Sequence, residues 1–145
     1  EVEANIIEQM VKLYAMGIPY LPGAVDAVAL ASAHFPVGLA SGSPRSLIET
    51  VTRDEALKGK FQCVLSGDQV EHGKPSPDVY LETARHLQVM PEACVCLEDS
   101  GNGILAGKNA GMKVMRVWSE PSQRMPWVRV YSISLSSPPQ IQSSS

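Results

Sequence analysis

Apolar residues recur at helical spacing in the first part of the chain. Over residues 2–16 they follow the i, i+3, i+4, i+7 pattern of a single helix face, and Gly17 then predicts the end of a helix. Residues 24–34 are rich in Ala and apolar on most sides, which predicts a second helix. Two prolines fall between these segments, so we interpret residues 19–23 as a connector.

From Phe35 onward the pattern changes to short apolar runs that do not alternate cleanly. The runs are Val37–Ala40, Cys63–Ser66, Cys94–Leu97 and Val114–Val117. Continuous apolar runs of this length are typical of parallel strands buried on both faces. The helical segments between them have start signals, which are Ser43-Pro44, Ser76-Pro77-Asp78 and Asp99-Ser100. Strands that alternate with helices predict an α/β fold, a Rossmann-like parallel sheet with flanking helices.

The C-terminal segment, residues 119–145, has a different composition. It contains 9 Ser and 4 Pro and no Gly. We expect most of this Ser/Pro-rich tail to be disordered, because it has too little apolar surface to fold. Tyr131, Ile133 and Leu135 alternate with polar residues, which favours one edge strand within the tail.

Composition narrows the classes of partner. The chain has 12 basic and 15 acidic residues and a formal net charge of -3, so it has no electrostatic footprint for nucleic acid or an anionic membrane. Its apolar runs are shorter than the roughly 18 residues that a membrane span needs. Cys63, Cys94 and Cys96 do not form a disulfide framework, and we expect them to be buried packing residues. We therefore expect a cytoplasmic protein.

The residues after the first apolar run are candidates for anion binding. Ligands of open parallel sheets bind outside the carboxyl ends of the strands. Ser41, Gly42 and Ser43 stand at such an end, where they offer hydroxyl groups and backbone N–H groups at the start of a helix. A helix cap is the more common role for such residues, so on this feature alone capping is the favoured interpretation.

The next two strand ends carry a lysine and an acidic pair. Pro75 keeps Lys74 out of the helical region, and a lysine fixed in this way can neutralise a phosphate, although an ordinary exposed lysine is the plainer alternative. Glu98 and Asp99 offer the carboxylate oxygens that suit Mg²⁺, although Asp99 or Ser100 could simply cap the next helix. Together, the hydroxyl turn, the lysine and the acidic pair are what phosphoryl transfer needs.

The order of three motifs resembles the haloacid dehalogenase-like hydrolase superfamily, in particular its branch of β-phosphoglucomutase-like and sugar-phosphate phosphatases. The motifs are Gly-Leu-Ala-Ser41-Gly-Ser, Gly-Lys74-Pro-Ser-Pro-Asp-Val-Tyr and Cys-Leu-Glu98-Asp99-Ser-Gly-Asn-Gly. The resemblance extends from about residue 21 to residue 117. It implies that residues 1–18 are the end of a helical cap domain, that residues 19–118 are part of the α/β core, and that residues 119–145 follow it as a tail.

The resemblance also implies a role for each motif. Ser41 is similar to the hydroxyl that bonds the transferring phosphoryl group, and the two residues after it would offer backbone contacts. Lys74 is similar to the lysine that binds phosphate and offsets the charge of the nucleophile. Asp99 is similar to a direct Mg²⁺ ligand, with Glu98 acting beside it directly or through water.

The family's first motif, Asp-x-Asp, is absent from this sequence. In the family it ends a strand in the middle of the sheet, between the strands that here lead to Ser41 and to Glu98, and it supplies the nucleophile. The five aspartates of this chain include no pair with that spacing. We therefore expect a central gap with unpaired backbone groups and the loss of one of the metal's two carboxylates. We also expect the chain to be an internal piece of an enzyme.

The sequence leaves two main functions open. The resemblance implies a Mg²⁺-dependent phosphohydrolase, acting on a small phosphorylated metabolite through an aspartyl-phosphate in the complete protein, with a sugar phosphate as the favoured substrate. The alternative is a catalytically inactive fragment or splice product that at most binds phosphate or a protein partner. A flavodoxin-like or receiver-type module is less favoured, because it would need an acidic or phosphate pocket of its own at the first strand.

Overall fold

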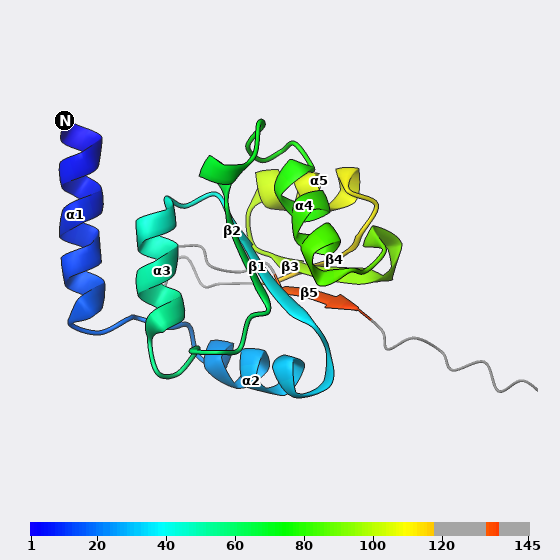
Figure 1. Ribbon diagram of the computed structural model, residues 1–145, viewed down its shortest axis with the longest axis horizontal. Helices are drawn as coiled ribbons and strands as arrows, with labels where there is room; N and C mark the ends of the chain where they lie inside the picture. Colours follow the sequence, from blue (N-terminus) through cyan, green and yellow to red (C-terminus); the bar gives the residue numbers. More distant parts are fainter. Residues whose placement is uncertain (118–132, 137–145) are drawn as a thin grey trace, which may run out of the picture.

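The computed structural model describes residues 1–117 and 133–136 (Figure 1). Helices and strands alternate along most of this length. Their bounds are α1 Val2–Ala15, α2 Ala24–His34, β1 Val37–Ser41, α3 Arg45–Arg53, β2 Cys63–Ser66, α4 Asp78–Leu87, β3 Cys94–Glu98, α5 Gly101–Asn109, β4 Lys113–Arg116 and β5 Ile133–Ser136, with 3-10 turns η1 Gly67–Gln69 and η2 Pro91–Ala93. The two N-terminal helices and the four strands that the apolar pattern predicts are confirmed.

The sheet has the strand order β2-β1-β5-β3-β4. β1 pairs with β2 in parallel, and β3 pairs with β4 in parallel, so the predicted α/β fold class is confirmed. One apolar core contains residues of α4 and α5, and a second contains residues of α2 and α3. Figure 1 shows these helix pairs on either side of the sheet. β1 contributes Ala40 to the first core and Val37 to the second, because successive side chains of a strand point to opposite faces.

The centre of the sheet is filled by β5, which runs antiparallel to both of its neighbours. Leu135 pairs with Val37 of β1 and with Val95 of β3. The prediction of an edge strand in the tail is therefore wrong in its position, and the expected central gap is closed in this part of the sheet. A strand placed here supplies partners to backbone groups of β1 and β3 that burial would otherwise leave unpaired. The other residues of the predicted disordered tail lie outside the described residues.

The apolar pattern predicts that all four strands are buried on both faces, and this prediction is wrong for β4. It lies at the edge of the sheet, and most of its residues are exposed, with Met115 58% exposed. An edge strand has a neighbour on one side only, which accounts for this exposure. By contrast, every residue of β1 is buried.

The helix starts agree with the predicted caps in one case of three. The Ser100 hydroxyl caps α5 by accepting a hydrogen bond of 3.0 Å from the Gly103 N–H. α3 and α4 begin one residue later than predicted, because Pro44 and Pro77 occupy their N-cap positions without a side-chain cap. The N–H of Ser43 donates instead to the Ser41 hydroxyl, at 3.1 Å.

α1 is the outermost helix of the described chain (Figure 1). It packs beside α3, and none of its residues is buried. Within the described residues, no helix is both long enough and apolar enough to cross a membrane.

Candidate functional site

Lys74 connects the carboxyl ends of β1 and β3. Its ammonium nitrogen lies 3.2 Å from the Ala40 carbonyl oxygen, one residue before Ser41, and 2.5 Å from the Glu98 carboxylate. Because strands of one direction end at the same edge of a sheet, a lysine in the loop before α4 reaches both ends. The structure therefore brings together the lysine and Glu98, the first residue of the acidic pair that the sequence pattern singles out.

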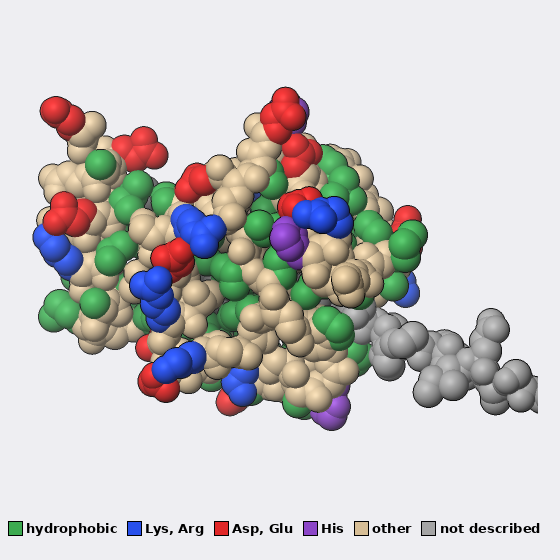
Figure 2. Space-filling model, viewed as in Figure 1, with side chains coloured by type: hydrophobic (Ala, Val, Ile, Leu, Met, Phe, Trp, Pro, Cys, Tyr) green, Lys and Arg blue, Asp and Glu red, His purple; other side chains and the backbone are tan. Residues whose placement is uncertain are grey.

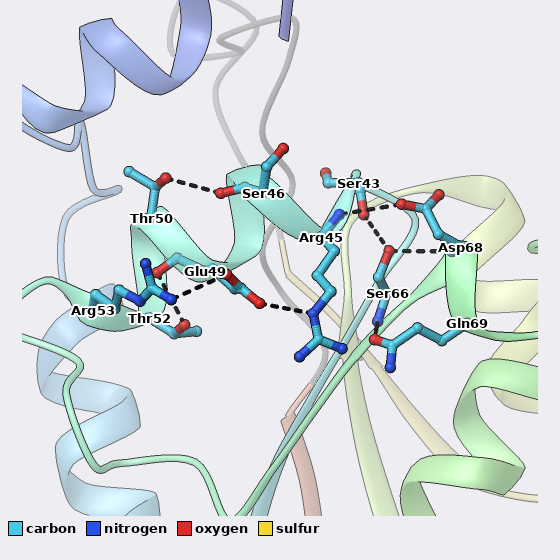
Figure 3. A network of polar contacts seen from close by, with 10 residues as sticks. All are labelled: Ser43, Arg45, Ser46, Glu49, Thr50, Thr52, Arg53, Ser66, Asp68 and Gln69. Atoms are coloured by element: carbon cyan, nitrogen blue, oxygen red, sulfur yellow. Dashed lines mark hydrogen bonds and ion pairs between the residues drawn. The ribbon is translucent and has the colours of Figure 1, made fainter. Parts of the chain in front are cut away.

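The loop after β1 is held in a fixed shape by the end of β2. The Ser66 hydroxyl donates to the Ser43 carbonyl oxygen at 2.8 Å (Figure 3), and the Ser41 hydroxyl accepts from the Ser43 N–H. A Cβ at Gly67 would lie 3.3 Å from the Gly42 Cα atom, so the two loops touch at their backbones. Ser41 is 1% exposed.

A carboxylate from η1 lies at the N-terminus of α3. Asp68 accepts a hydrogen bond of 3.2 Å from the Arg45 N–H (Figure 3), a position that the helix dipole makes favourable for a negative charge. Ser66 and Gln69 form a capping box around the same turn. The contribution of this turn to the site was missed by sequence reasoning, although Ser-x-x-Gln is a recognisable capping-box pattern.

The loop that carries Lys74 is held by contacts with α5 and α4. The Lys74–Pro75 peptide bond is cis, and the Asn109 side chain of α5 donates to the Pro75 carbonyl oxygen at 3.1 Å. The Lys74 ammonium group also donates to the Tyr80 hydroxyl at 3.0 Å. The plainer interpretation of Lys74 as an ordinary exposed lysine therefore does not hold, since its side chain is only 13% exposed.

Glu98 is buried beneath the start of α5. One of its carboxylate oxygens accepts from Lys74 and Tyr80, and the other accepts from the Ser100 hydroxyl at 3.1 Å. A Cβ at Gly103 would overlap this carboxyl group, so the small residue makes room for the buried acid. Glu98 is thus bound on both oxygens by neighbours in the chain.

Asp99 follows directly at the carboxyl end of β3, and its Oδ1 atom is buried. Among residues 1–117 and 133–136 there is no cluster of three or more His, Cys, Asp or Glu side chains that could hold a metal ion. The metal roles of Asp99 and Glu98 therefore stay predictions. Cys63, Cys94 and Cys96 are buried, as predicted for packing residues.

Comparison with known proteins links this arrangement to a family. A sequence model described as haloacid dehalogenase-like hydrolase matches residues 3–111. Hexitol phosphatase B of Escherichia coli K12 is 38% identical over 138 residues, which are 94% of this chain and 62% of that protein. Fructose-1-phosphate phosphatase YqaB of the same strain is 34% identical over 93 residues, which are 64% of this chain and 50% of that protein. The chain thus spans half to three fifths of the length of these two relatives.

Solved structures support the same relationship. The crystal structure of CbbY from Rhodobacter sphaeroides in complex with phosphate superimposes with a TM-score of 0.70 and 36% sequence identity. The superposition covers 76% of this chain and 51% of CbbY.

Proposed function

Because the chain belongs to the haloacid dehalogenase-like hydrolases, we propose that it is part of a Mg²⁺-dependent phosphatase that acts on a small phosphorylated metabolite. The observation that carries the proposal is the position of Lys74, whose ammonium group is fixed beside the hydroxyl loop of β1 and the acidic end of β3. We propose a sugar phosphate as the substrate class, since two relatives are named as phosphatases of a hexitol phosphate and of fructose 1-phosphate.

Ser41, Lys74 and Glu98 each have a different role in holding a phosphoryl group. Ser41 offers its hydroxyl at the N-terminus of α3, where an anion is favoured. The N–H groups of Ser43 and Arg45 already donate to Ser41 and to Asp68, so a bound phosphate would replace these acceptors. Lys74 supplies a positive charge close to this loop, and Glu98 keeps that charge in place. Fixed donors of this kind stabilise the negative charge that spreads over the phosphoryl oxygens during transfer.

The carboxylates at the end of β3 fit a Mg²⁺ ion that takes one direct ligand from the chain. Asp99 lies at the end of β3 with a carboxylate, whereas both oxygens of Glu98 are already bound by the chain. Mg²⁺ commonly takes one or two protein carboxylates and completes its shell with waters and phosphate oxygens. When bound, the ion would neutralise charge on the phosphoryl oxygens. We therefore propose Asp99 as the direct ligand and place Glu98 behind it, against Lys74.

A second function is favoured by the absence of Asp-x-Asp from the sequence and by the presence of β5 at the centre of the sheet. In this reading the 145-residue chain binds phosphate but does not hydrolyse phosphate esters. The backbone positions beside β1 and β3 are taken by a strand that contains Ser, Ile and Leu only. None of these residue types has a carboxylate that could act as a nucleophile.

Two measurements on the 145-residue chain separate these functions. Inorganic phosphate binding is measured by calorimetry with and without MgCl₂, and hydrolysis is measured with p-nitrophenyl phosphate, fructose 1-phosphate and hexitol phosphates. Turnover that Asp99→Ala abolishes supports the phosphatase. Phosphate binding without turnover supports the second function, and a chain that neither binds nor hydrolyses contradicts both.

The role of Lys74 is tested by replacing it with Met, and the matched control is the same replacement at a surface lysine. Lys74→Met removes the buried ammonium group, whereas Lys58→Met removes an exposed one whose side chain is 66% exposed. We expect phosphate binding to be lost in the first variant and retained in the second. Equal binding by both variants would remove Lys74 from the proposed site.

A further inference from the structure

The Tyr80 hydroxyl is a buried polar group in the apolar face of α4. Tyr80 is 1% exposed, and its neighbours on this face include Val79, Thr83 and Ala84, which are equally buried. A buried tyrosine hydroxyl needs a hydrogen-bond partner. Two of its partners here carry opposite charges, since it accepts from Lys74 at 3.0 Å and donates to Glu98 at 2.5 Å.

The Lys74 ammonium group has three protons to donate, and the chain provides three acceptors for them. These acceptors are the carboxylate of Glu98, the hydroxyl of Tyr80 and the carbonyl of Ala40. The ammonium nitrogen also lies 4.6 Å from the centre of the Tyr80 ring, where the face of the ring attracts a cation. Tyr80 therefore holds the ammonium group through both its ring and its hydroxyl.

A neutral hydroxyl suits this position better than a second carboxylate would. It adds a hydrogen bond to Lys74 without adding negative charge that would repel a phosphate at the end of β1. Burial, and then the nearby Cys96 and Glu98 side chains, raise the pKa of Tyr80 well above its usual value, so the hydroxyl keeps its proton. It can then donate to Glu98 while it accepts from Lys74.

We propose that Tyr80 is a positioning residue whose hydroxyl fixes the Lys74 ammonium group at the loop after β1, and so sets the affinity of that loop for phosphate. Without the hydroxyl, Lys74 keeps two acceptors, and Glu98 loses one of its donors. The ammonium group then exchanges between orientations and spends less time beside the hydroxyl loop. The consequence for phosphate rests on the proposed function, whereas the fixing of Lys74 does not.

The test compares two tyrosine variants. Tyr80→Phe keeps the buried ring and removes the hydroxyl. Tyr20→Phe is the matched control, because the Tyr20 hydroxyl also donates to a carboxylate, that of Asp54 at 3.0 Å, but belongs to the core on the α2 side. Urea unfolding of both variants measures how far each loss of a hydroxyl alters stability.

The first measurement is the ¹H–¹⁵N NMR signal of the Lys74 ammonium group, assigned by its absence in Lys74→Met. A fixed and shielded ammonium group exchanges its protons slowly, so we expect the signal in the wild type and in Tyr20→Phe. We expect it to broaden beyond detection in Tyr80→Phe. An unchanged signal in a folded Tyr80→Phe chain would overturn the proposal. If Tyr80→Phe does not fold, 3-fluorotyrosine is incorporated in place of tyrosine, which keeps the ring and the hydroxyl. The NMR signal of the Lys74 ammonium group must then shift, and an unchanged signal would overturn the proposal.

The second measurement is the affinity for inorganic phosphate. Loss of one hydrogen bond to Lys74 should weaken binding about 3- to 10-fold in Tyr80→Phe and leave Tyr20→Phe unchanged. Equal affinity in wild type and Tyr80→Phe would overturn the proposal. If the wild type binds no phosphate, the proposed function fails, and the NMR signal alone then decides whether Tyr80 positions Lys74.

Discussion

At the scale of single residues, the site depends on one buried ion pair. Glu98 is 3% exposed and takes hydrogen bonds from Lys74, Tyr80 and Ser100. A buried carboxylate is tolerated when it is paired and hydrogen-bonded in this way. The arrangement also needs space, and Gly103 provides it at the first turn of α5. The buried Glu98 carboxylate therefore depends on the absence of a side chain at Gly103.

Gly103→Ala is expected to destabilise the chain. The added methyl group would overlap the Glu98 carboxyl group, which must move and lose hydrogen bonds, so we expect the free energy of unfolding to fall by about 2 kcal/mol. The control is Gly101→Ala at the start of the same helix, where a Cβ meets no atom within 4 Å. Its effect should stay within about 1 kcal/mol. Urea unfolding checks both, and similar values for the two would contradict the packing argument.

Glu82 on the exposed side of α4 gives a pH-dependent prediction. Hydrogen bonds from Arg85, followed by the charges of Arg85 and His86, lower the pKa of Glu82 from 4.5 to about 2. The folded state then favours the ionised carboxylate, so this contribution to stability is present above pH 4.5 and is lost as the pH falls toward 2. A ¹³C NMR titration of the side-chain carboxyl group measures the pKa directly.

Arg85→Ala should return the Glu82 pKa toward 4.5, whereas Arg53→Ala should leave it unchanged, because Arg53 pairs with Glu49 on α3. High salt should also raise the pKa in the wild type, since exposed ion pairs are screened. Figure 2 shows charged side chains of both signs spread over the visible face. A Glu82 titration near pH 4.5 in the wild type would show that the pair with Arg85 does not form in solution.

At the scale of elements, the central strand β5 is the part of the sheet most distant in sequence from its partners. Its backbone pairs with residues 37–39 of β1 and with residues 94–95 of β3. It is also the only described strand that runs against the direction of its neighbours. Backbone groups of two buried strands depend on it for their hydrogen bonds.

Two truncated chains test this dependence. Residues 1–136 retain β5, and residues 1–132 lack it but are otherwise the same. We expect the longer chain to unfold cooperatively like the full chain. We expect the shorter one to aggregate or lose its cooperative transition, because exposed strand edges invite pairing between molecules. Circular dichroism during urea unfolding and sedimentation measure the two properties. Equal stability of both chains would show that β5 does not support the sheet.

The strands and helices of residues 2–117 were predictable because their signals are local. Gly17 stops the first helix, and the apolar runs Cys63–Ser66 and Cys94–Leu97 became strands with at most one residue added. The place of β5 was not predictable, since alternation at Ile133 and Leu135 indicates a strand but does not say which strands it pairs with. Pairing is a property of the whole sheet.

The candidate site also contains residues that the sequence predicts and residues that only the folded structure reveals. Ser41 and Glu98 could be identified because each ends an apolar run at the end of a strand, and Lys74 because Pro75 restricts it in the loop between β2 and α4. Tyr80 could not, since its spacing on α4 is that of a core residue and only the folded structure brings its hydroxyl to Lys74. The plain interpretation of Ser100 as a helix cap was correct, and it holds together with the contact to Glu98.

At the scale of the whole molecule, β1 joins two cores that lie on opposite faces of one sheet. The α4–α5 core supports Lys74 through Tyr80, and the α2–α3 core lies on the other face. Because both cores use the same strand, neither can open without exposing the other. We therefore expect the described fold to unfold in a single transition, and the candidate site to be lost with it.

Val51→Ala and Val79→Ala test this expectation as a matched pair. Both valines are buried on helices, on α3 and α4 respectively, and belong to different cores. Each change should lower the free energy of unfolding by about 2 kcal/mol, and the double variant should show the sum, since the sites lie on opposite faces. NMR signals of Val28 and Ala106 report on the two cores during urea unfolding. They should share one midpoint in every variant, and two separate midpoints would mean that the cores unfold independently and that the site can be lost while the α2–α3 core remains.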